Sequence, residues 1–365
     1  MSIIIFIVIL ALLILVHEFG HFIVAKKSGI RVDEFGLGFP PKIYSKKFGD
    51  TLYTLNAIPF GGFVKIFGED PHSEEITEED KPSSFFYKPK WIQALVLVAG
   101  VSFNVIFAWL LISFGYTLGL PSSVDESNFD RITDAKVVII EVLDSLPANV
   151  SGLKPGDFIT SISSGGVLIE GSNLRSEKIA ELISGSGNDG VTIKYKRASD
   201  EERIVTVIPK VDSSDKKIIG IAMENIGMLK LPLFEALLEG AKSTYYLTLA
   251  TVEGLAGFFW DTLRLQSDFS QVTGPIGIAG VVGEASALGF TYLLSLTALI
   301  SINLAIINLL PFPALDGGRL LFVIIEAITR RPINPNFVRW ANTAGFALLI
   351  LLMIIVTGHD IVKLF

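Results

Sequence analysis

The 365-residue sequence contains no cysteine, which excludes disulfide bonds, thiolate metal ligands and cysteine nucleophiles. Histidine is scarce, at four residues, and charged residues make up only 18% of the chain. No basic arm or arginine-rich face is present, and the formal net charge is −7. Nucleic acid is therefore not expected as a partner. Any metal site must be built from a few imidazoles and from carboxylates.

Hydrophobic residues, by contrast, make up half of the chain, and the mean hydropathy is +0.55. A soluble protein of this length is rarely so apolar, so a polytopic α-helical membrane protein is expected. The first apolar stretch lacks the basic start and the small-residue cleavage pattern of a signal peptide, so it is interpreted as an uncleaved span. Four stretches have the roughly 20 apolar residues that a spanning helix needs: 3–25, 92–116, 290–310 and 340–357.

Basic residues are concentrated in two of the segments that flank these spans, 26–90 and 319–339. Because cytoplasmic loops carry an excess of Lys and Arg, both segments are expected in the cytoplasm. Both termini and the long middle segment are then outside. The lipid bilayer is therefore an expected partner.

The segment 134–210 has the signals of one small α+β domain. Three β-branched runs, KVVIIEVL, VTIKYKR and RIVTVIP, predict strands, and SEKIAELIS has helical spacing. The following segment, 228–268, is expected to form one or two amphipathic helices at the outer interface. Residues 245–262 are apolar enough for a fifth span, but a fifth crossing would invert the basic loop after the third span. That alternative stays open.

A shorter region, 50–68, reads DTLYTLNAIPFGGFVKIFG and lies within the first basic segment. Its alternating pattern, interrupted by a proline and two glycines, predicts strands joined by a turn, too broken for a spanning helix. The sequence therefore predicts a β-hairpin between the first two spans. The organisation expected is thus a membrane part over 1–120, the domain at 134–210, the amphipathic helices, and a second membrane part over 288–365.

The stretch HEFGH, residues 17–21, interrupts the first apolar run with an H-E-x-x-H pattern. On a helix, residues four apart lie on one face, so His17 and His21 can bind one zinc ion. Glu18 is then placed to act as a general base toward water at the metal. The pattern also arises by chance, but a charge inside a spanning helix costs about 2.5–3.5 kcal/mol, and a shared metal offsets that cost.

A zinc site of this kind needs a third protein ligand and one open position. His72 and His359 lie away from the expected depth of HEFGH, so a carboxylate is expected. Asp316, in NLLPFPALDGG at the end of the third span, arrives at the matching depth. The alternative is that Asp316 serves as a helix cap or turn residue.

These two motifs together resemble the site-2 protease family of intramembrane zinc metalloproteases, and more narrowly the bacterial regulator of sigma-E protease group. The resemblance extends over almost the whole chain. It includes GGFVK at 61–65, Gly100 and Asn104 in the second span, GLKPGDFI in a PDZ-like domain at 134–210, and TGPIGI before the third span. For Gly100 and Asn104, helix packing and a satisfied polar group are at least as good an explanation as a catalytic role. Some family members carry two PDZ domains, whereas this chain has room for one.

The resemblance implies one zinc ion bound by His17, His21 and Asp316, with Glu18 as the catalytic base. It also implies that Gly61, Gly62 and Phe63 belong to a membrane-associated hairpin that pairs with an extended substrate, and that Asn308 holds the unwound segment. The implied substrates are transmembrane segments of single-span proteins, such as anti-sigma factors, and remnant signal peptides. An inactive scaffold or chaperone that binds helices through the PDZ-like domain is the alternative. A transporter is disfavoured because repeated hydrophobic halves are missing.

Overall fold

The computed structural model describes residues 1–69, 76–124, 131–187, 190–197, 201–212, 216–264 and 273–362. Within them the chain forms two compact units. The first contains 1–113, 237–285 and 293–365, and the second contains 114–236 and 286–292.

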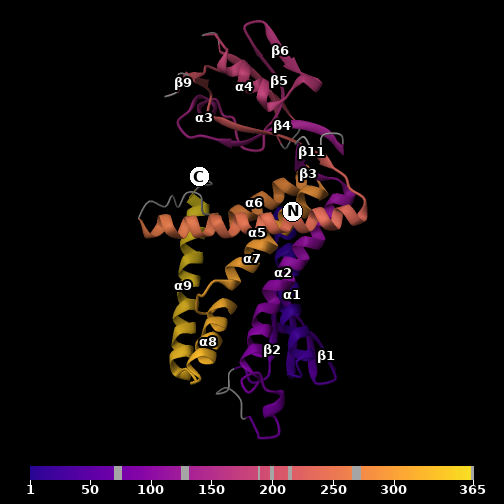
Figure 1. Cartoon of the computed structure of the whole chain (residues 1–365), viewed down its shortest axis with the longest axis vertical. Helices are drawn as coiled ribbons and strands as arrows, with labels where there is room; N and C mark the ends of the chain where they lie inside the picture. Colours follow the sequence, from indigo (N-terminus) through magenta and orange to yellow (C-terminus); the bar gives the residue numbers. More distant parts are fainter. Residues whose placement is uncertain are drawn as a thin grey trace. The chain divides into compact units, whose positions relative to one another are not determined.

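Four helices are long and apolar enough to span a membrane within the described residues. Their number agrees with the four stretches expected from the sequence, and each helix covers its predicted stretch to within one residue or extends beyond it. These helices run lengthwise through the first unit in Figure 1. They are α1 (Ser2–Lys27), α2 (Lys90–Leu118), α7 (Phe290–Leu309) and α9 (Pro335–Val362).

Three further described helices belong mainly to the first unit: α5 (Leu233–Leu263), α6 (Pro275–Leu288) and α8 (Asp316–Thr329). The region 228–268, expected to hold one or two amphipathic helices, contains the continuous 31-residue helix α5. Charged residues interrupt its apolar face, and α5 is not among the candidate spans. It lies across the direction of the spanning helices (Figure 1). Helix α8 had no counterpart in the sequence prediction, because its 14 residues follow the third span too closely to show a separate pattern.

The hairpin between α1 and α2 is longer than the predicted 50–68. It consists of β1 (Val32–Phe48) and β2 (Thr51–Ile66), which are antiparallel and turn at Gly49 and Asp50. Gly61 and Gly62 fall within the bounds of β2, but β2 reverses direction between 51–56 and 62–66, so a turn lies where the sequence places one, and Gly61 has φ +88°. Strand β1 gives no strand signal in the sequence, because its Gly- and Pro-containing stretch lacks a clean alternation.

The pairing pattern makes this hairpin a small sheet of four segments. Residues 34–37 pair with 52–55 on one side, and residues 32–37 pair with 62–66 on the other, whereas 42–48 pair with 51–56. The order across the sheet is therefore 42–48, 51–56, 32–37, 62–66. Segment 62–66 is an edge. Helix α1 packs against β2, which brings this edge beside HEFGH.

The second unit is built around an antiparallel sheet with the strand order β3-β11-β4-β5-β7-β8, and β6 pairs with β5. Its last strand, β11, runs antiparallel between β3 and β4 and lies beyond the boundary at residue 210 drawn from the sequence. A buried cluster that includes Ile139, Ile162, Ile179 and Ile193 forms its core. Its elements are β3 (Leu120–Ser123), β4 (Ile132–Val142), α3 (Pro147–Val150), β5 (Phe158–Ser164), β6 (Val167–Glu170), α4 (Ser176–Ser184), β7 (Val191–Lys196), β8 (Glu202–Val207), β9 (Lys210–Val211), β10 (Lys217–Ile218) and β11 (Ile221–Leu229).

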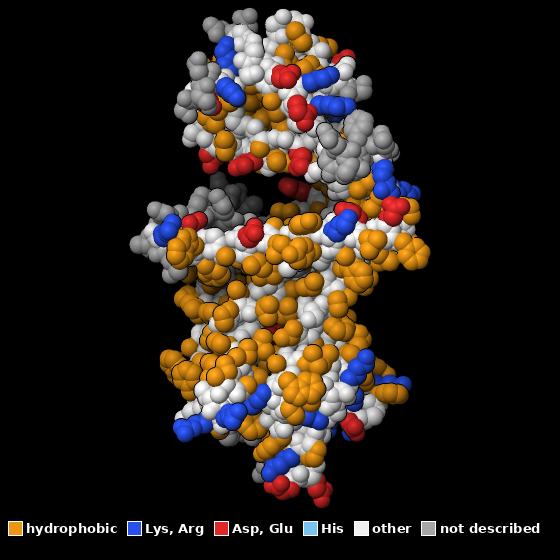
Figure 2. Space-filling view, in the orientation of Figure 1, with side chains coloured by type: hydrophobic (Ala, Val, Ile, Leu, Met, Phe, Trp, Pro, Cys, Tyr) orange, Lys and Arg blue, Asp and Glu red, His pale blue; other side chains and the backbone are white. Residues whose placement is uncertain are grey.

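Close helix contacts hold α1 at the centre of the first unit. Leu13 is fully buried in a cluster with Ile9 and Val282. A Cβ at Gly20 would lie 2.6 Å from the backbone oxygen of Ala99 on α2, so only glycine permits this approach. Figure 2 shows hydrophobic side chains covering the outside of these helices, with Lys and Arg gathered at the end that carries β1, β2 and α8.

Candidate metal centre

Two imidazole rings of α1 meet in the interior of the first unit. His17 and His21 are each 6% exposed, and their Nε2 atoms lie 3.1 Å apart. The rings approach edge to face, with centroids 4.8 Å apart. This is the geometry that the four-residue spacing predicts, because both side chains lie on one face of the helix, one turn apart.

Asp316, the first residue of α8, brings a carboxylate to the same point. Its Oδ2 lies 2.9 Å from His17 Nε2 and 3.2 Å from His21 Nε2. The turn before it contains Ala314 at φ +76°, a conformation that costs a non-glycine residue about 1–3 kcal/mol. The Ala314 N–H donates to Asn342 Oδ1 on α9 at 3.2 Å. Helix α9 therefore braces the strained turn that presents the carboxylate.

The two glycines after Asp316 are required by close backbone contacts. A Cβ at Gly317 would lie 2.2 Å from the Leu309 carbonyl oxygen, and one at Gly318 would lie 2.2 Å from that of Phe312. Real Cβ atoms do not approach backbone so closely. The sequence Asp-Gly-Gly thus allows α8 to begin directly against the end of α7, at the depth of the two histidines.

The three donor atoms fit a tetrahedral metal ion. Among the described residues they form the one group of three such side chains, with all ligand atoms within 4.8 Å of one another. Ligands about 2.0–2.2 Å from a tetrahedral zinc lie roughly 3.3–3.6 Å apart, so small outward movements of the three side chains suffice. Two imidazoles and one carboxylate leave a fourth position open, as in catalytic zinc sites. His72 lies outside the described residues, and His359 is not part of this group.

The ring of His21 is held in the tautomer that metal binding needs. Its Nδ1 lies 2.8 Å from the Val96 carbonyl oxygen, which can only accept, so Nδ1 carries the proton and Nε2 keeps its lone pair. Gly100, one turn along α2, faces the same ring. A Cβ there would lie 2.3 Å from His21 Nε2 and 2.8 Å from His17 Nε2. Gly100 therefore leaves the space in which the donor atoms converge.

Asn104 occupies the equivalent position beside His17. It is fully buried, its Nδ2 lies 3.4 Å from His17 Nδ1, and its Oδ1 has no hydrogen-bond partner. Side-chain amide orientation is an assignment that the hydrogen-bond network decides. With the amide reversed, Oδ1 accepts the His17 Nδ1–H and the buried oxygen is satisfied. Ser301 fixes the backbone at this point by donating to the Asn104 carbonyl oxygen at 2.8 Å.

Glu18 lies on the open side of the histidine pair. It lines a cavity of about 190 Å³ together with His21, Asp316 and Phe63. This cavity also contains Glu69 and Arg319, which form an ion pair across it. A carboxylate, a metal-ligand group and a space for a reacting molecule thus meet at one place. The sequence gives no indication that Arg319 and Glu69 belong to this site, because neither is part of a recognisable motif.

The predicted substrate-binding residues separate into two groups. Gly61, Gly62 and Phe63 lie at or next to the edge segment 62–66, and a Cβ at Gly62 would be 3.8 Å from Glu18 Cγ. Phe63 also lines the cavity beside Glu18. Asn308 lies in the last turn of α7, half-buried, and does not line that cavity.

Residues 5–352 match the sequence profile of Peptidase family M50. The regulator of sigma-W protease RasP of Bacillus subtilis is 30% identical over 441 residues, covering 100% of this chain and 99% of that protein. The zinc metalloprotease RasP of Geobacillus kaustophilus is 30% identical over 443 residues, covering 100% and 98%. Both alignments are longer than this chain, so these relatives contain residues without a counterpart here.

Among solved structures, the PDZ domain of an SdrC-like protein from Listeria monocytogenes is similar to part of the chain. The identity is 26%, the match covers 25% of this chain and 90% of that domain, and the TM-score is 0.21.

Proposed function

Because the chain belongs to peptidase family M50, it is a zinc metalloprotease of the site-2 type, and we propose that it hydrolyses peptide bonds inside transmembrane segments of single-span membrane proteins. The observation that supports this most directly is the position of His17, His21 and Asp316 within and beside spanning helices. A soluble substrate would not require a site at that depth.

We assign His17, His21 and Asp316 as the ligands of one zinc ion, which supplies Lewis acidity at the peptide carbonyl. Glu18 takes a proton from the attacking water and passes it to the nitrogen of the leaving amine. Its carboxylate lines the cavity beside the ligands and is half-buried, so it can reach a substrate there. Val96 orients the ring of His21, and Asn104 orients the ring of His17. In this orientation both Nε2 atoms would face a bound zinc ion.

Segment 62–66 is the proposed docking edge for the substrate backbone. It pairs with 32–37 on one side, no described strand pairs with its other side, and the Val64 backbone N–H donates to the Glu18 carboxylate. A transmembrane helix must unwind before its peptide bonds can be attacked, and an edge strand supplies hydrogen bonds to the extended chain. Asn308, at the end of α7, is assigned to the neighbouring part of the unwound segment.

The orientation we propose follows from the basic residues near the ends of the spans. The hairpin, α8 and the metal centre lie toward the cytoplasm, and both termini and the PDZ-like domain, around 134–210, lie outside. The membrane is then the cytoplasmic membrane of a bacterium. Physiological substrates would include anti-sigma factors, in line with the sigma-W designation of the Bacillus subtilis relative, and remnant signal peptides.

The catalytic assignment is tested with Glu18→Gln in the purified chain and a model single-span substrate. General acid–base catalysis contributes about 10²–10⁴-fold, so cleavage should fall by that factor while bound zinc stays at one ion per chain. Undiminished cleavage by the variant would refute the role of Glu18. A wild-type protein that binds substrate helices but contains no zinc and cleaves nothing would favour the scaffold alternative.

Orientation is testable because the chain has no cysteine of its own. Val150 in the second unit is 81% exposed, and Arg331 lies exposed in the linker after α8. In intact cells, a membrane-impermeant maleimide should label Val150→Cys and leave Arg331→Cys unlabelled until the membrane is opened. The reverse pattern would overturn the proposed topology.

A further inference from the structure

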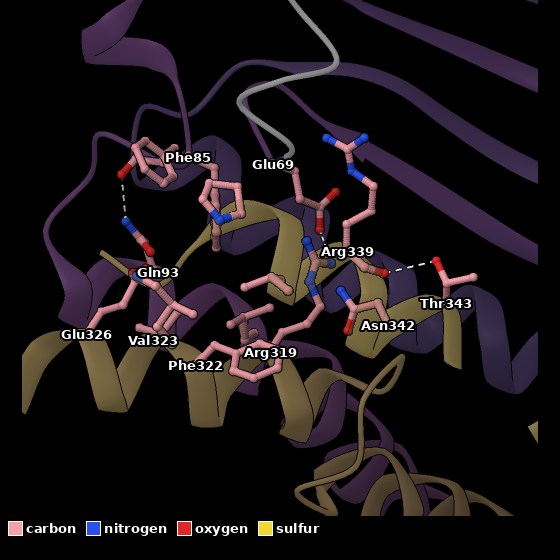
Figure 3. Close-up of a pocket in the computed structure, with 15 residues that line it drawn as sticks. Glu69, Phe85, Gln93, Arg319, Phe322, Val323, Glu326, Arg339, Asn342 and Thr343 are labelled. Carbon is pink, nitrogen blue, oxygen red and sulfur yellow. Dashed lines mark hydrogen bonds and ion pairs between the residues drawn. The ribbon is translucent and has the colours of Figure 1, made fainter. Parts of the chain in front are cut away.

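A second cavity, of about 280 Å³, adjoins the catalytic one and is not used by the proposed reaction (Figure 3). It lies between the start of α2, helix α8 and the start of α9. The two cavities share Glu69, Leu97 and Arg319 in their walls. Much of the lining is apolar and comes from Phe85, Leu97, Phe322, Val323 and Val338.

Of the charged side chains that line this cavity, one arginine has no carboxylate partner among the described residues. Glu69 pairs with Arg319. Glu326 accepts from Lys90 at 2.6 Å and from the Ile333 N–H at 2.9 Å. Arg339, which is exposed, has no carboxylate partner among the described residues. In Figure 3 its side chain extends from α9 on the side of the cavity that holds Glu69.

Exposed aromatic residues mark the depth of the cavity. Trp91 near the start of α2 and Trp340 near the start of α9 are 68% and 74% exposed, and Tyr87 and Phe337 are exposed beside them. Tryptophan and tyrosine gather where a membrane meets water. Helix α9, which supplies Arg339, is also the least buried of the four candidate spans. The cavity therefore lies at the level of lipid headgroups and borders a helix that faces lipid.

We propose that this cavity binds an anionic phospholipid. The lipid belongs to the leaflet at the end of the first unit where Lys and Arg gather. Its phosphate lies at Arg339, and part of one acyl chain lies against Phe322, Val323 and Val338. A guanidinium that no described carboxylate pairs with, beside an apolar space, complements such a molecule, and basic pockets between spanning helices at this side of a membrane bind anionic headgroups. A soluble anion would leave the apolar walls unused.

Occupancy of this cavity is linked to the metal centre through its walls. Asn342 lines the cavity and also accepts the Ala314 N–H in the turn that presents Asp316. Arg319 and Glu69 line both cavities. A lipid held at Arg339 thus packs beside the residues that fix the Asp316 turn, and it should make that turn more rigid.

The experiment uses the full chain carrying Glu18→Gln, so that binding is read without proteolysis. Native mass spectrometry, or exchange in nanodiscs, compares phosphatidylglycerol with phosphatidylcholine. One phosphatidylglycerol should bind preferentially, and Arg339→Gln should weaken it about fivefold, the effect of one basic residue near a membrane surface. Arg331→Gln is the matched control, because Arg331 is exposed at the same end and does not line the cavity.

Two further arms separate the alternatives. Val338→Trp should fill the cavity and abolish preferential binding, and glycerol phosphate, which has no acyl chain, should not compete. Equal losses for Arg339→Gln and Arg331→Gln would indicate diffuse surface charge and refute the site. Competition by glycerol phosphate would refute the acyl-chain component. Unchanged lipid binding with a raised KM in an Arg339→Gln protease with Glu18 intact would refute the lipid and assign the cavity to the substrate.

Discussion

The side chain of Asn104 faces the Nδ1 atom of His17, on the opposite side of the ring from Asp316. Because Asn104 is fully buried, its amide has to satisfy its hydrogen bonds within the protein. Accepting the His17 Nδ1–H does this and leaves the Nε2 lone pair for a metal. Asn104 is therefore a positioning residue that acts through His17.

Replacing Asn104 should weaken zinc binding before it affects folding. Loss of an outer-shell partner typically costs 10–100-fold in metal affinity, and we expect that range for Asn104→Leu, which keeps the size of the side chain. Asn104→Asp keeps an acceptor and should retain most of the affinity. The measurement is zinc content after dialysis against graded chelator, together with the visible spectrum of the cobalt-substituted protein.

Ser301→Ala is the control for Asn104. It removes a buried hydrogen bond to the Asn104 backbone and leaves the His17 contact intact. Zinc affinity should stay within about twofold of wild type. If Ser301→Ala and Asn104→Leu lowered affinity equally, Asn104 would be a packing residue only.

Gly100→Ala should prevent metal binding by occupying the point where the ligands converge. The added Cβ would lie 2.3 Å from His21 Nε2, and neither that ring nor the buried α2 backbone has room to move away. Gly280→Ala is the matched control, because a Cβ on that helical glycine meets nothing within 4 Å. Zinc content of the purified variants decides the outcome. A Gly100→Ala protein with a full complement of zinc would contradict the position of α2.

The features that the sequence predicts best are those that depend on a single local pattern. The four spans follow from apolar length, and the His17–His21 pair follows from a spacing of four on a helix. Asp316 was found by its depth in the third span. Asn342 could not be found in this way, because its partner Ala314 is 28 residues away and their contact depends on how α9 packs.

The hairpin illustrates the same limit in a different form. Gly61 and Gly62 look like turn residues, and locally that interpretation is sound. In the fold, one turn lies at Gly49 and Asp50, and a second reversal lies between 56 and 62, where Gly61 has φ +88°. The sequence does not predict that 32–37 pairs between the two arms of β2, because pairing over that distance leaves no mark in a short window.

Gly36→Ala should impair substrate binding while leaving the metal in place. Its Cβ would lie 2.4 Å from the Phe63 ring, so Phe63 must shift where it lines the catalytic cavity. We expect KM for a single-span substrate to rise about tenfold or more, equivalent to roughly 1.4 kcal/mol of lost binding. Tyr44→Ala, exposed on the far segment of the sheet, should behave as wild type. A KM that is equal in both variants would argue against docking at segment 62–66.

The second unit contains a buried ion pair between Asp157 and Arg197, and we expect its stability to depend on that pair. Asp157, in GLKPGDFI, is fully buried, and Arg197 contacts its two oxygens at 2.7 and 2.8 Å. Among the described residues, Arg197→Met would leave that carboxylate with the one Lys154 N–H that it already accepts. Because an uncompensated buried charge costs about 3–5 kcal/mol, the second unit should unfold at lower temperature or be cut sooner by protease.

Arg203→Met is the comparison that separates burial from charge in this unit. Arg203 pairs with Glu201 at 3.4 Å, and both side chains are more than one-third exposed. Surface pairs contribute about 0–1 kcal/mol, so this variant should lose little stability. Zinc content should be unchanged in both variants, since the metal ligands belong to the first unit. Equal destabilisation by Arg203→Met and Arg197→Met would show that burial of Asp157 is not the cause.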